Sequence, residues 1–148
     1  MSPLRILVVE DYAPFRRLMC SLLEQHDFQI VGEASDGLQA VHMAEKLQPD
    51  LITLDIGLPG LNGLDVAERA RRIAPHARIV FVSQESSSAL IGDILRLGSP
   101  AYVHKPRVHS DLLPRDRRRS WRQAIRQRRA GTWRRPRRLP RTWAPVLF

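Results

Sequence analysis

The sequence lacks three features that would each indicate a particular class of protein. It has one cysteine, Cys20, so we expect neither a disulfide framework nor a cysteine-based metal site. No apolar run approaches the roughly 18 residues that span a bilayer. The first apolar run, Leu4 to Val9, is short and acidic residues follow it, so no secretory signal peptide is expected. These absences favour a cytoplasmic protein with no membrane contact. The sequence also contains no internal repeat of the kind that forms a solenoid.

Negative charge is scarce in only one part of the chain. Residues 1–106 carry 10 basic and 13 acidic side chains, whereas residues 107–148 carry 14 arginines and 2 aspartates. The overall charge of +9 is therefore an average over an acidic part and a strongly basic part. We predict a domain over residues 1–120, followed over 121–148 by an Arg-, Pro- and Trp-rich tail that is extended or disordered.

Short apolar runs alternate with amphipathic stretches along the domain. The sequence predicts strands at 4–9, 28–34, 51–54, 78–82 and 101–104. It predicts helices at 13–26, 38–47, 64–73 and 89–97, and a fifth helix capped by Ser110. Alternation with short connections implies βαβ units and a parallel sheet that helices cover on both faces. We therefore expect an α/β, doubly wound, three-layer domain.

One of these strands runs directly into an aspartate. Leu51-Ile52-Thr53-Leu54 is followed by Asp55 and then by a loop containing Gly57, Pro59 and Gly60. An unpaired carboxylate buried in a core costs several kcal/mol. Asp55 is better placed at the carboxyl edge of a parallel sheet, where such folds bind ligands.

Polar side chains also follow other predicted strands. Glu10 and Asp11 follow the first, Ser83 the fourth and Lys105 the fifth. Because the carboxyl ends of parallel strands share one edge, we expect these side chains to converge on Asp55. Taken alone, Glu10 and Asp11 are equally compatible with a solvated turn that caps the next helix.

Such a cluster has a definite chemistry. Carboxylates held together raise one another's pKa values, and a hard divalent cation such as Mg²⁺ relieves the repulsion. The metal and Lys105 would together stabilise a phosphoryl group in transfer. An aspartate can accept that group as an aspartyl phosphate.

The chain resembles the receiver domains of two-component response regulators. The resemblance covers about residues 3–113 and rests on the segments 6–11, 54–63, 82–83 and 102–106, which occur in the family's order. It implies a flavodoxin-like fold with a five-stranded sheet of order 2-1-3-4-5. Residues 58–64 and 101–103 are closest to the subfamily that usually carries a C-terminal helix-turn-helix, but no such pattern is present here.

The resemblance assigns roles to the acidic residues. Asp55 would be the phosphoacceptor, taking its phosphoryl group from a phosphohistidine of a sensor kinase. Glu10, Asp11 and Asp55 would hold Mg²⁺ together with the backbone carbonyl of Gly57. The protein would assist its own phosphorylation and dephosphorylation, and it would not be an enzyme with a separate substrate.

The resemblance also assigns a switch. Lys105 would pair with the phosphoryl oxygens, Ser83 would move toward them, and Tyr102 would swing inward behind Ser83. Simpler interpretations are a solvated charge for Lys105, a strand-end hydroxyl for Ser83 and a static core position for Tyr102. The resemblance also implies a cis bond between Lys105 and Pro106, a form that X–Pro bonds make inexpensive.

One position departs from the family's pattern. The residue after Ser83 is usually small, whereas here it is Gln84, followed by Glu85. A long side chain there can obstruct small phosphodonors or alter dephosphorylation, so the lifetime of the phosphoryl group is open. The histidines show no metal-ligand spacing, and we expect them at the surface or in turns: His26, His42, His76, His104 and His109.

Two kinds of protein partner follow from the resemblance. A sensor histidine kinase would dock near the first helix, around Phe15, Arg16 and Met19. A homodimer would form through the face of the fourth helix and fifth strand. The cognate kinase, the signal and the output stay open.

Two other functions compete with a phosphoacceptor. A Mg²⁺-dependent hydrolase with Asp55 as nucleophile usually needs a second aspartate two residues later, where this chain has Gly57. A degenerate receiver would act only as a protein- or nucleic-acid-binding module, through its surface and its basic tail.

The tail has three interpretations. Residues 115–148 contain 13 arginines and no lysine. The tail can be a disordered arm that contacts nucleic-acid phosphates non-specifically, with Trp121, Trp133 and Trp143 stacking on bases. It can also be a helical extension to Arg129 that serves solubility or self-association, or a segment translated out of frame in place of a lost domain.

Overall fold

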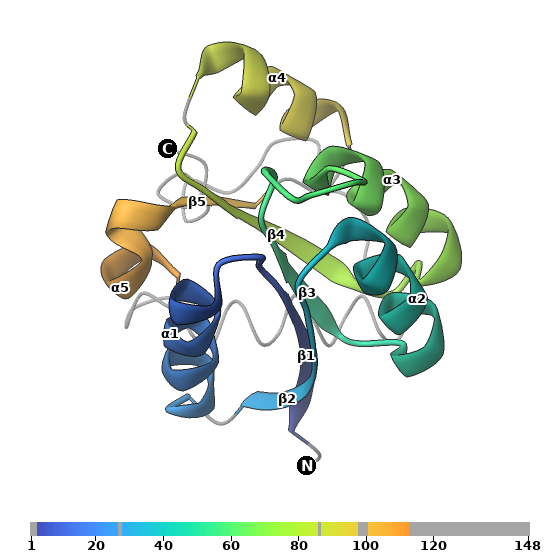
Figure 1. The fold of residues 1–148 in the computed structure, drawn as a ribbon, viewed down its shortest axis with the longest axis vertical. Helices are drawn as coiled ribbons and strands as arrows, with labels where there is room; N and C mark the ends of the chain where they lie inside the picture. Colours follow the sequence, from blue (N-terminus) through green and yellow to red (C-terminus); the bar gives the residue numbers. More distant parts are fainter. Residues whose placement is uncertain (1–2, 27, 86, 98–100, 113–148) are drawn as a thin grey trace.

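A parallel β-sheet with helices on both faces forms the domain (Figure 1). The computed structural model describes residues 3–26, 28–85, 87–97 and 101–112. The strands are β1 (Leu4–Val9), β2 (Phe28–Ala34), β3 (Leu51–Leu54), β4 (Arg78–Ser83) and β5 (Tyr102–His104). The helices are α1 (Ala13–Glu24), α2 (Gly37–Leu47), α3 (Gly63–Ile73), α4 (Ser88–Arg96), the 3-10 turn η1 (Lys105–Arg107) and α5 (Val108–Asp111).

The sheet has five strands in the order β2-β1-β3-β4-β5, and every neighbouring pair is parallel. The predicted α/β class, doubly wound three-layer arrangement and strand order are therefore confirmed. The chain changes direction across the sheet between β1 and β3. In open α/β sheets this switch point is where the carboxyl ends of the strands form a binding crevice.

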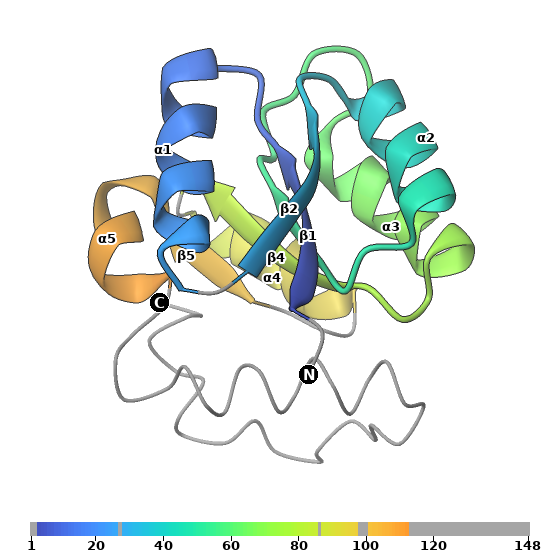
Figure 2. The same ribbon diagram turned by 90° about the horizontal axis from the view of Figure 1, so that it is seen from below.

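Helices α1 and α5 cover one face of the sheet, and α2, α3 and α4 cover the other (Figure 2). Strand β1 lies between the two layers, so its successive side chains enter different cores. Ile6 and Val8 pack with α1, whereas Leu7 and Val9 pack with α2 and α3. This double burial explains why the strand is a continuous apolar run and does not alternate with polar residues.

Side-chain caps begin three of the helices. The carboxylate of Asp36 accepts the Gln39 N–H at 2.8 Å at the start of α2. Asn62 accepts the Asp65 N–H at 3.0 Å at the start of α3, and Ser87 accepts the Leu90 N–H before α4. Each cap pairs an amide that the helix itself leaves unbonded.

Two predicted helix boundaries are wrong by two residues or more. Helix α1 ends at Glu24, earlier than the predicted His26. The fifth helix begins at Val108, with Arg107 at its N-cap position, so Ser110 lies inside the helix and not before it. The reason is Pro106, whose fixed φ suits the first turn of a helix. It is the second residue of η1, which continues directly into α5.

The described part of the chain contains no helix with the length and apolar content needed to cross a bilayer. The predicted tail over 121–148, including Trp121, Trp133 and Trp143, lies outside the described residues.

Candidate metal centre

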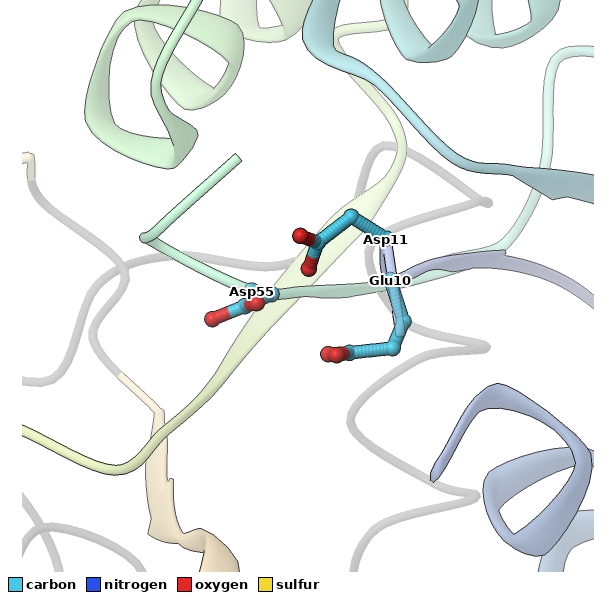
Figure 3. Close-up of side chains that lie close together, drawn as sticks. All are labelled: Glu10, Asp11 and Asp55. Carbon is cyan, nitrogen blue, oxygen red and sulfur yellow. The ribbon is translucent and has the colours of Figure 1, made fainter. Parts of the chain in front are cut away.

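Three carboxylates meet at the carboxyl edge of the sheet (Figure 3). Glu10 and Asp11 follow β1, and Asp55 follows β3, which pairs with β1. One carboxylate oxygen from each residue lies within 4.8 Å of the others. Glu10 and Asp55 are buried, while Asp11 is exposed at the mouth of the cluster. A buried set of oxygen donors with one open side suits a hard divalent cation such as Mg²⁺.

Lys105 approaches the same cluster from the end of β5. Its ammonium nitrogen lies 2.9 Å from Glu10 Oε1 and 3.3 Å from Asp55 Oδ2. The side chain is only 11% exposed, so it is not a solvated surface charge. The structure therefore brings Lys105, Glu10, Asp11 and Asp55 together, as the shared strand edge predicts.

The carboxyl group of Glu10 holds its proton unusually tightly. Burial is the main reason that its pKa rises from 4.5 to about 7. The nearby negative charge of Asp55 raises this pKa further, while the Lys105 ammonium and the Tyr12 N–H oppose the shift. Glu10 thus lies in a site that disfavours its negative charge, and a bound cation would relieve that cost.

The loop after β3 holds Asp55 in place through close backbone contacts. The Asp55 N–H donates to the carbonyl of Val9 at 3.1 Å, and the Gly57 N–H lies 3.3 Å from Asp55 Oδ1. At the far end of the loop, the Gly63 N–H donates to the Ile56 carbonyl at 2.9 Å. A Cβ on Gly63 would lie 2.2 Å from the carbonyl oxygen of Asp55, so only glycine permits this approach.

Ser83 and Tyr102 meet at the loop that follows β4. Both side chains are buried. The Ser83 hydroxyl accepts the Glu85 N–H at 3.1 Å, and the Tyr102 hydroxyl donates to the Glu85 carbonyl. Burial, with the nearby Glu85 charge, raises the pKa of Tyr102, which keeps its hydroxyl a donor. One loop residue therefore links the two predicted switch residues.

The predicted cis bond is wrong for this structure. The described residues contain no cis peptide bond, so the bond between Lys105 and Pro106 is trans. Lys105 and Pro106 are the first two residues of η1.

Residues 6–115 match the response regulator receiver domain. The chain belongs to this family. It is 30% identical over 102 residues to the chemotaxis protein CheY of Thermotoga maritima, covering 69% of this chain and 85% of that protein. It is 39% identical over 114 residues to the transcriptional regulatory protein PdtaR of Mycobacterium tuberculosis, covering 76% of this chain and 54% of the relative. The chain thus spans only about half the length of the PdtaR regulator.

Solved receiver structures agree with the fold. The response regulator domain of Thermotoga maritima CheB is 35% identical, has a TM-score of 0.66, and the match covers 84% of this chain and 95% of that domain. A LuxR-family two-component response regulator from Aurantimonas sp. is 26% identical with a TM-score of 0.73, covering 99% and 96% of the two chains. The protein is therefore a receiver domain of two-component signalling with a CheY-like, flavodoxin-like fold.

Helix α1 of the receiver domain differs from the predicted kinase surface. Met19 is 2% exposed and packs in the core, so it does not belong to a docking surface. Arg16 donates to the Glu10 carbonyl at 2.9 Å and pairs with Glu33 at 3.3 Å. Phe15 is half-buried and lies under the Lys105 ammonium, 4.7 Å from ring centre to nitrogen. Phe15 and Arg16 therefore both contact residues of the acidic site.

The sequence interpretation also missed a contact of His104. Its Nε2 lies 2.9 Å from the carbonyl oxygen of Gln84, so this histidine has a partner and is not simply a surface residue. The side chains of Gln84 and Glu85 are themselves exposed. The only sequence signal for the contact is that His104 directly precedes Lys105 on the strand beside Ser83.

Proposed function

We propose that this receiver domain accepts a phosphoryl group on Asp55 from a phosphohistidine of a sensor kinase, with Mg²⁺ as cofactor. The observation that carries the proposal is the position of the Lys105 ammonium, within 3.3 Å of Asp55 Oδ2 and beside the three-carboxylate cluster. Phosphorylation on aspartate and Mg²⁺ binding are general properties of the family, and the donors that both need are present in this chain.

The transfer is an in-line displacement at phosphorus. A carboxylate oxygen of Asp55 forms the new P–O bond while the P–N bond to the kinase imidazole breaks, and the imidazole leaves with that electron pair. Glu10, Asp11, Asp55 and the carbonyl of Gly57 would hold Mg²⁺, which supplies charge neutralisation at the phosphoryl oxygens. Lys105 adds a second positive charge on the same oxygens.

The phosphoryl group then becomes a new partner for neighbouring side chains. The Ser83 hydroxyl accepts the Glu85 N–H, so its own proton is free to be donated to a phosphoryl oxygen. The Tyr102 hydroxyl is bound to the same loop, so a movement of Ser83 changes the surroundings of Tyr102. A local charge change at Asp55 would thereby switch the surface near β4 and β5 between two arrangements.

This account makes the domain a stoichiometric phosphoacceptor. A phosphatase of related fold would use an acid two residues after the nucleophile, and Gly57 offers no such group. Turnover of a small phosphate ester such as para-nitrophenyl phosphate, at more than one product per protein molecule, would favour the hydrolase instead.

The cellular setting is proposed on the same basis. We propose a cytoplasmic protein that meets its kinase at α1, near the exposed part of Phe15, and that pairs with a second copy through the α4 and β5 face.

A second candidate function rests on charge. Residues 107–148 carry a net charge of +12, which favours binding to polyanions through phosphate contacts. Fluorescence anisotropy of a labelled DNA duplex, titrated with the full chain at several salt concentrations, tests this function. Weakening of binding on adding salt, without preference among sequences, is the expected result, and absence of binding at low salt contradicts it.

Intact-mass measurement tests the main proposal. The full chain is incubated with phosphoramidate and Mg²⁺, with Asp55→Asn as the variant and with EDTA in a parallel sample. We expect one added phosphoryl group on the wild type and none on Asp55→Asn or with EDTA. An adduct on Asp55→Asn, or none on the wild type with either phosphoramidate or a phosphorylated kinase, overturns the proposal.

A further inference from the structure

Two side chains from one strand bind successive carbonyl groups of the loop after β4. The Tyr102 hydroxyl binds the Glu85 carbonyl, and His104 Nε2 lies 2.9 Å from the Gln84 carbonyl oxygen. Tyr102 and His104 are two residues apart on β5, so they lie on the same face of the strand. The pair therefore holds the loop at two neighbouring points.

The second contact shows which ring nitrogen of His104 carries a proton. A carbonyl oxygen only accepts hydrogen bonds, so His104 Nε2 must carry a proton to bind Gln84. Both the neutral Nε2–H tautomer and the imidazolium satisfy this requirement. The contact is thus a donated hydrogen bond that both charge states of the ring can make.

Two further contacts lie at the strand end that precedes this loop. Ser83 pairs with His104 at the ends of β4 and β5, and the Ser83 hydroxyl accepts the Glu85 N–H. The side chains of Gln84 and Glu85 are exposed. The sheet pairing places Ser83, and the hydrogen bonds from His104 and Tyr102 hold the next two residues, Gln84 and Glu85.

We propose that His104 is a positioning residue that holds the loop after β4 in the arrangement of the unphosphorylated domain. This inference rests on the proposed function, in which Ser83 moves toward a phosphoryl group on Asp55. Movement of Ser83 pulls on Gln84, its neighbour in the chain, and breaks the hydrogen bond from His104. The bond is therefore a restraint on the switch, separate from the one that Tyr102 supplies.

The restraint has a measurable size. A neutral hydrogen bond of this kind changes an equilibrium by about fivefold. Removing the donor at position 104 is expected to tighten binding of a phosphoryl analogue at Asp55 by about that factor. A side chain that keeps an N–H donor at similar reach is expected to preserve the wild-type affinity.

The test uses beryllofluoride with Mg²⁺ as the phosphoryl analogue, and the full chain. Its dissociation constant is measured by ¹⁹F NMR for wild type, His104→Leu, His104→Gln and the control His76→Leu, which changes an exposed histidine away from the loop. We expect His104→Leu to bind about fivefold more tightly, while His104→Gln and His76→Leu match the wild type. Unchanged or weaker binding by His104→Leu overturns the inference, and equal tightening by His104→Gln shows that the hydrogen bond is not the cause.

Two further measurements distinguish a failure of this inference from a failure of the proposed function. Absence of beryllofluoride binding by the wild type would count against the proposed function itself. Imidazole ¹⁵N NMR of the wild type tests the bond without any substitution, and so also serves if His104→Leu does not fold. A proton on Nε2 is expected at neutral pH, and a ring protonated only on Nδ1 would overturn the inference.

Discussion

The ammonium of Lys105 lies over the ring of Phe15, with the nitrogen 4.7 Å from the ring centre. The same nitrogen contacts Glu10 at 2.9 Å, so the aromatic face and the carboxylate fix its position together. Phe15 comes from the first turns of α1 and Lys105 from the end of β5, which are far apart in the sequence. This contact connects the helix at which we propose the kinase docks to the charge that would stabilise phosphoryl transfer.

Replacing the ring should therefore slow phosphorylation. Phe15→Leu keeps an apolar side chain but removes the cation–π interaction, which contributes about 0.5–1 kcal/mol. We expect phosphorylation by phosphoramidate to slow by about two- to fivefold, measured by intact mass over time, and Phe15→Tyr to stay close to the wild type. Because phosphoramidate needs no docking surface, an equal rate for Phe15→Leu would mean that the ring does not position Lys105.

The pKa of Glu10 predicts opposite pH dependences for metal binding and for stability. Mg²⁺ needs the carboxylate, so with a pKa of about 7 its affinity should be about tenfold higher near pH 8 than near pH 6. The raised pKa stabilises the metal-free fold fully below about pH 4.5, and this contribution is lost as pH rises through about 7.

Calorimetric titration with Mg²⁺ at the two pH values measures the first effect. Glu10→Gln is the control, because it cannot titrate, and it should bind Mg²⁺ more weakly with less change between the two pH values. The same tenfold change in Glu10→Gln would assign the pH dependence to another group.

The glycine at the start of α3 should tolerate no side chain. In Gly63→Ala the new Cβ would lie 2.2 Å from the Asp55 carbonyl oxygen and 2.6 Å from the Ile56 Cα. Displacement of the loop should lower the free energy of unfolding by about 1–3 kcal/mol and slow phosphorylation. Gly92→Ala in α4 is the matched control, since nothing lies within 4 Å of a Cβ added there. This substitution should raise the free energy of unfolding by about 0.5–1 kcal/mol. Urea unfolding of both variants decides the point, and equal midpoints would contradict it.

Arg16 should matter for metal binding even though it contacts no proposed ligand oxygen. Its guanidinium binds the backbone carbonyl of Glu10 and the carboxylate of Glu33, so it fixes the end of β1. Arg16→Gln should weaken Mg²⁺ binding by about tenfold, as loss of an outer partner of a metal ligand commonly does. Arg17→Gln is the control, because Arg17 is the exposed neighbour. Equal Mg²⁺ affinities for Arg16→Gln and Arg17→Gln by calorimetry would mean that Arg16 does not support the metal site.

The fold and the centre of the site could be predicted for a simple geometric reason. Buried parallel strands appear as continuous apolar runs, and their carboxyl ends share one edge, so Asp55 and Lys105 were expected at that edge. The spacing of apolar residues in α1 also indicates that Met19 is buried, because Met19 falls on the same apolar face of the helix as Leu23. Family resemblance placed Met19 at a docking surface, and the structure shows that burial decided its position.

The remaining contacts have no sequence signature. The hydrogen bond of His104 is to a backbone carbonyl, which every residue carries, so no residue type marks its partner. The position of Arg16 depends on how α1 crosses the sheet, which the spacing of apolar residues does not specify. The start of α5 depended on Pro106, whose turn-forming effect outweighed the capping potential of Ser110.

The most direct test of the account is to locate the phosphoryl group within the chain. The full chain is phosphorylated with phosphoramidate and Mg²⁺ and then reduced with borohydride, which converts an aspartyl phosphate to homoserine. Peptide mass spectrometry then locates the homoserine. The account predicts homoserine at position 55 in the wild type, dependent on Mg²⁺, and none in Asp55→Asn. Homoserine at another aspartate, a phosphoryl group on Ser83 that survives reduction, or no Mg²⁺-dependent product would contradict it.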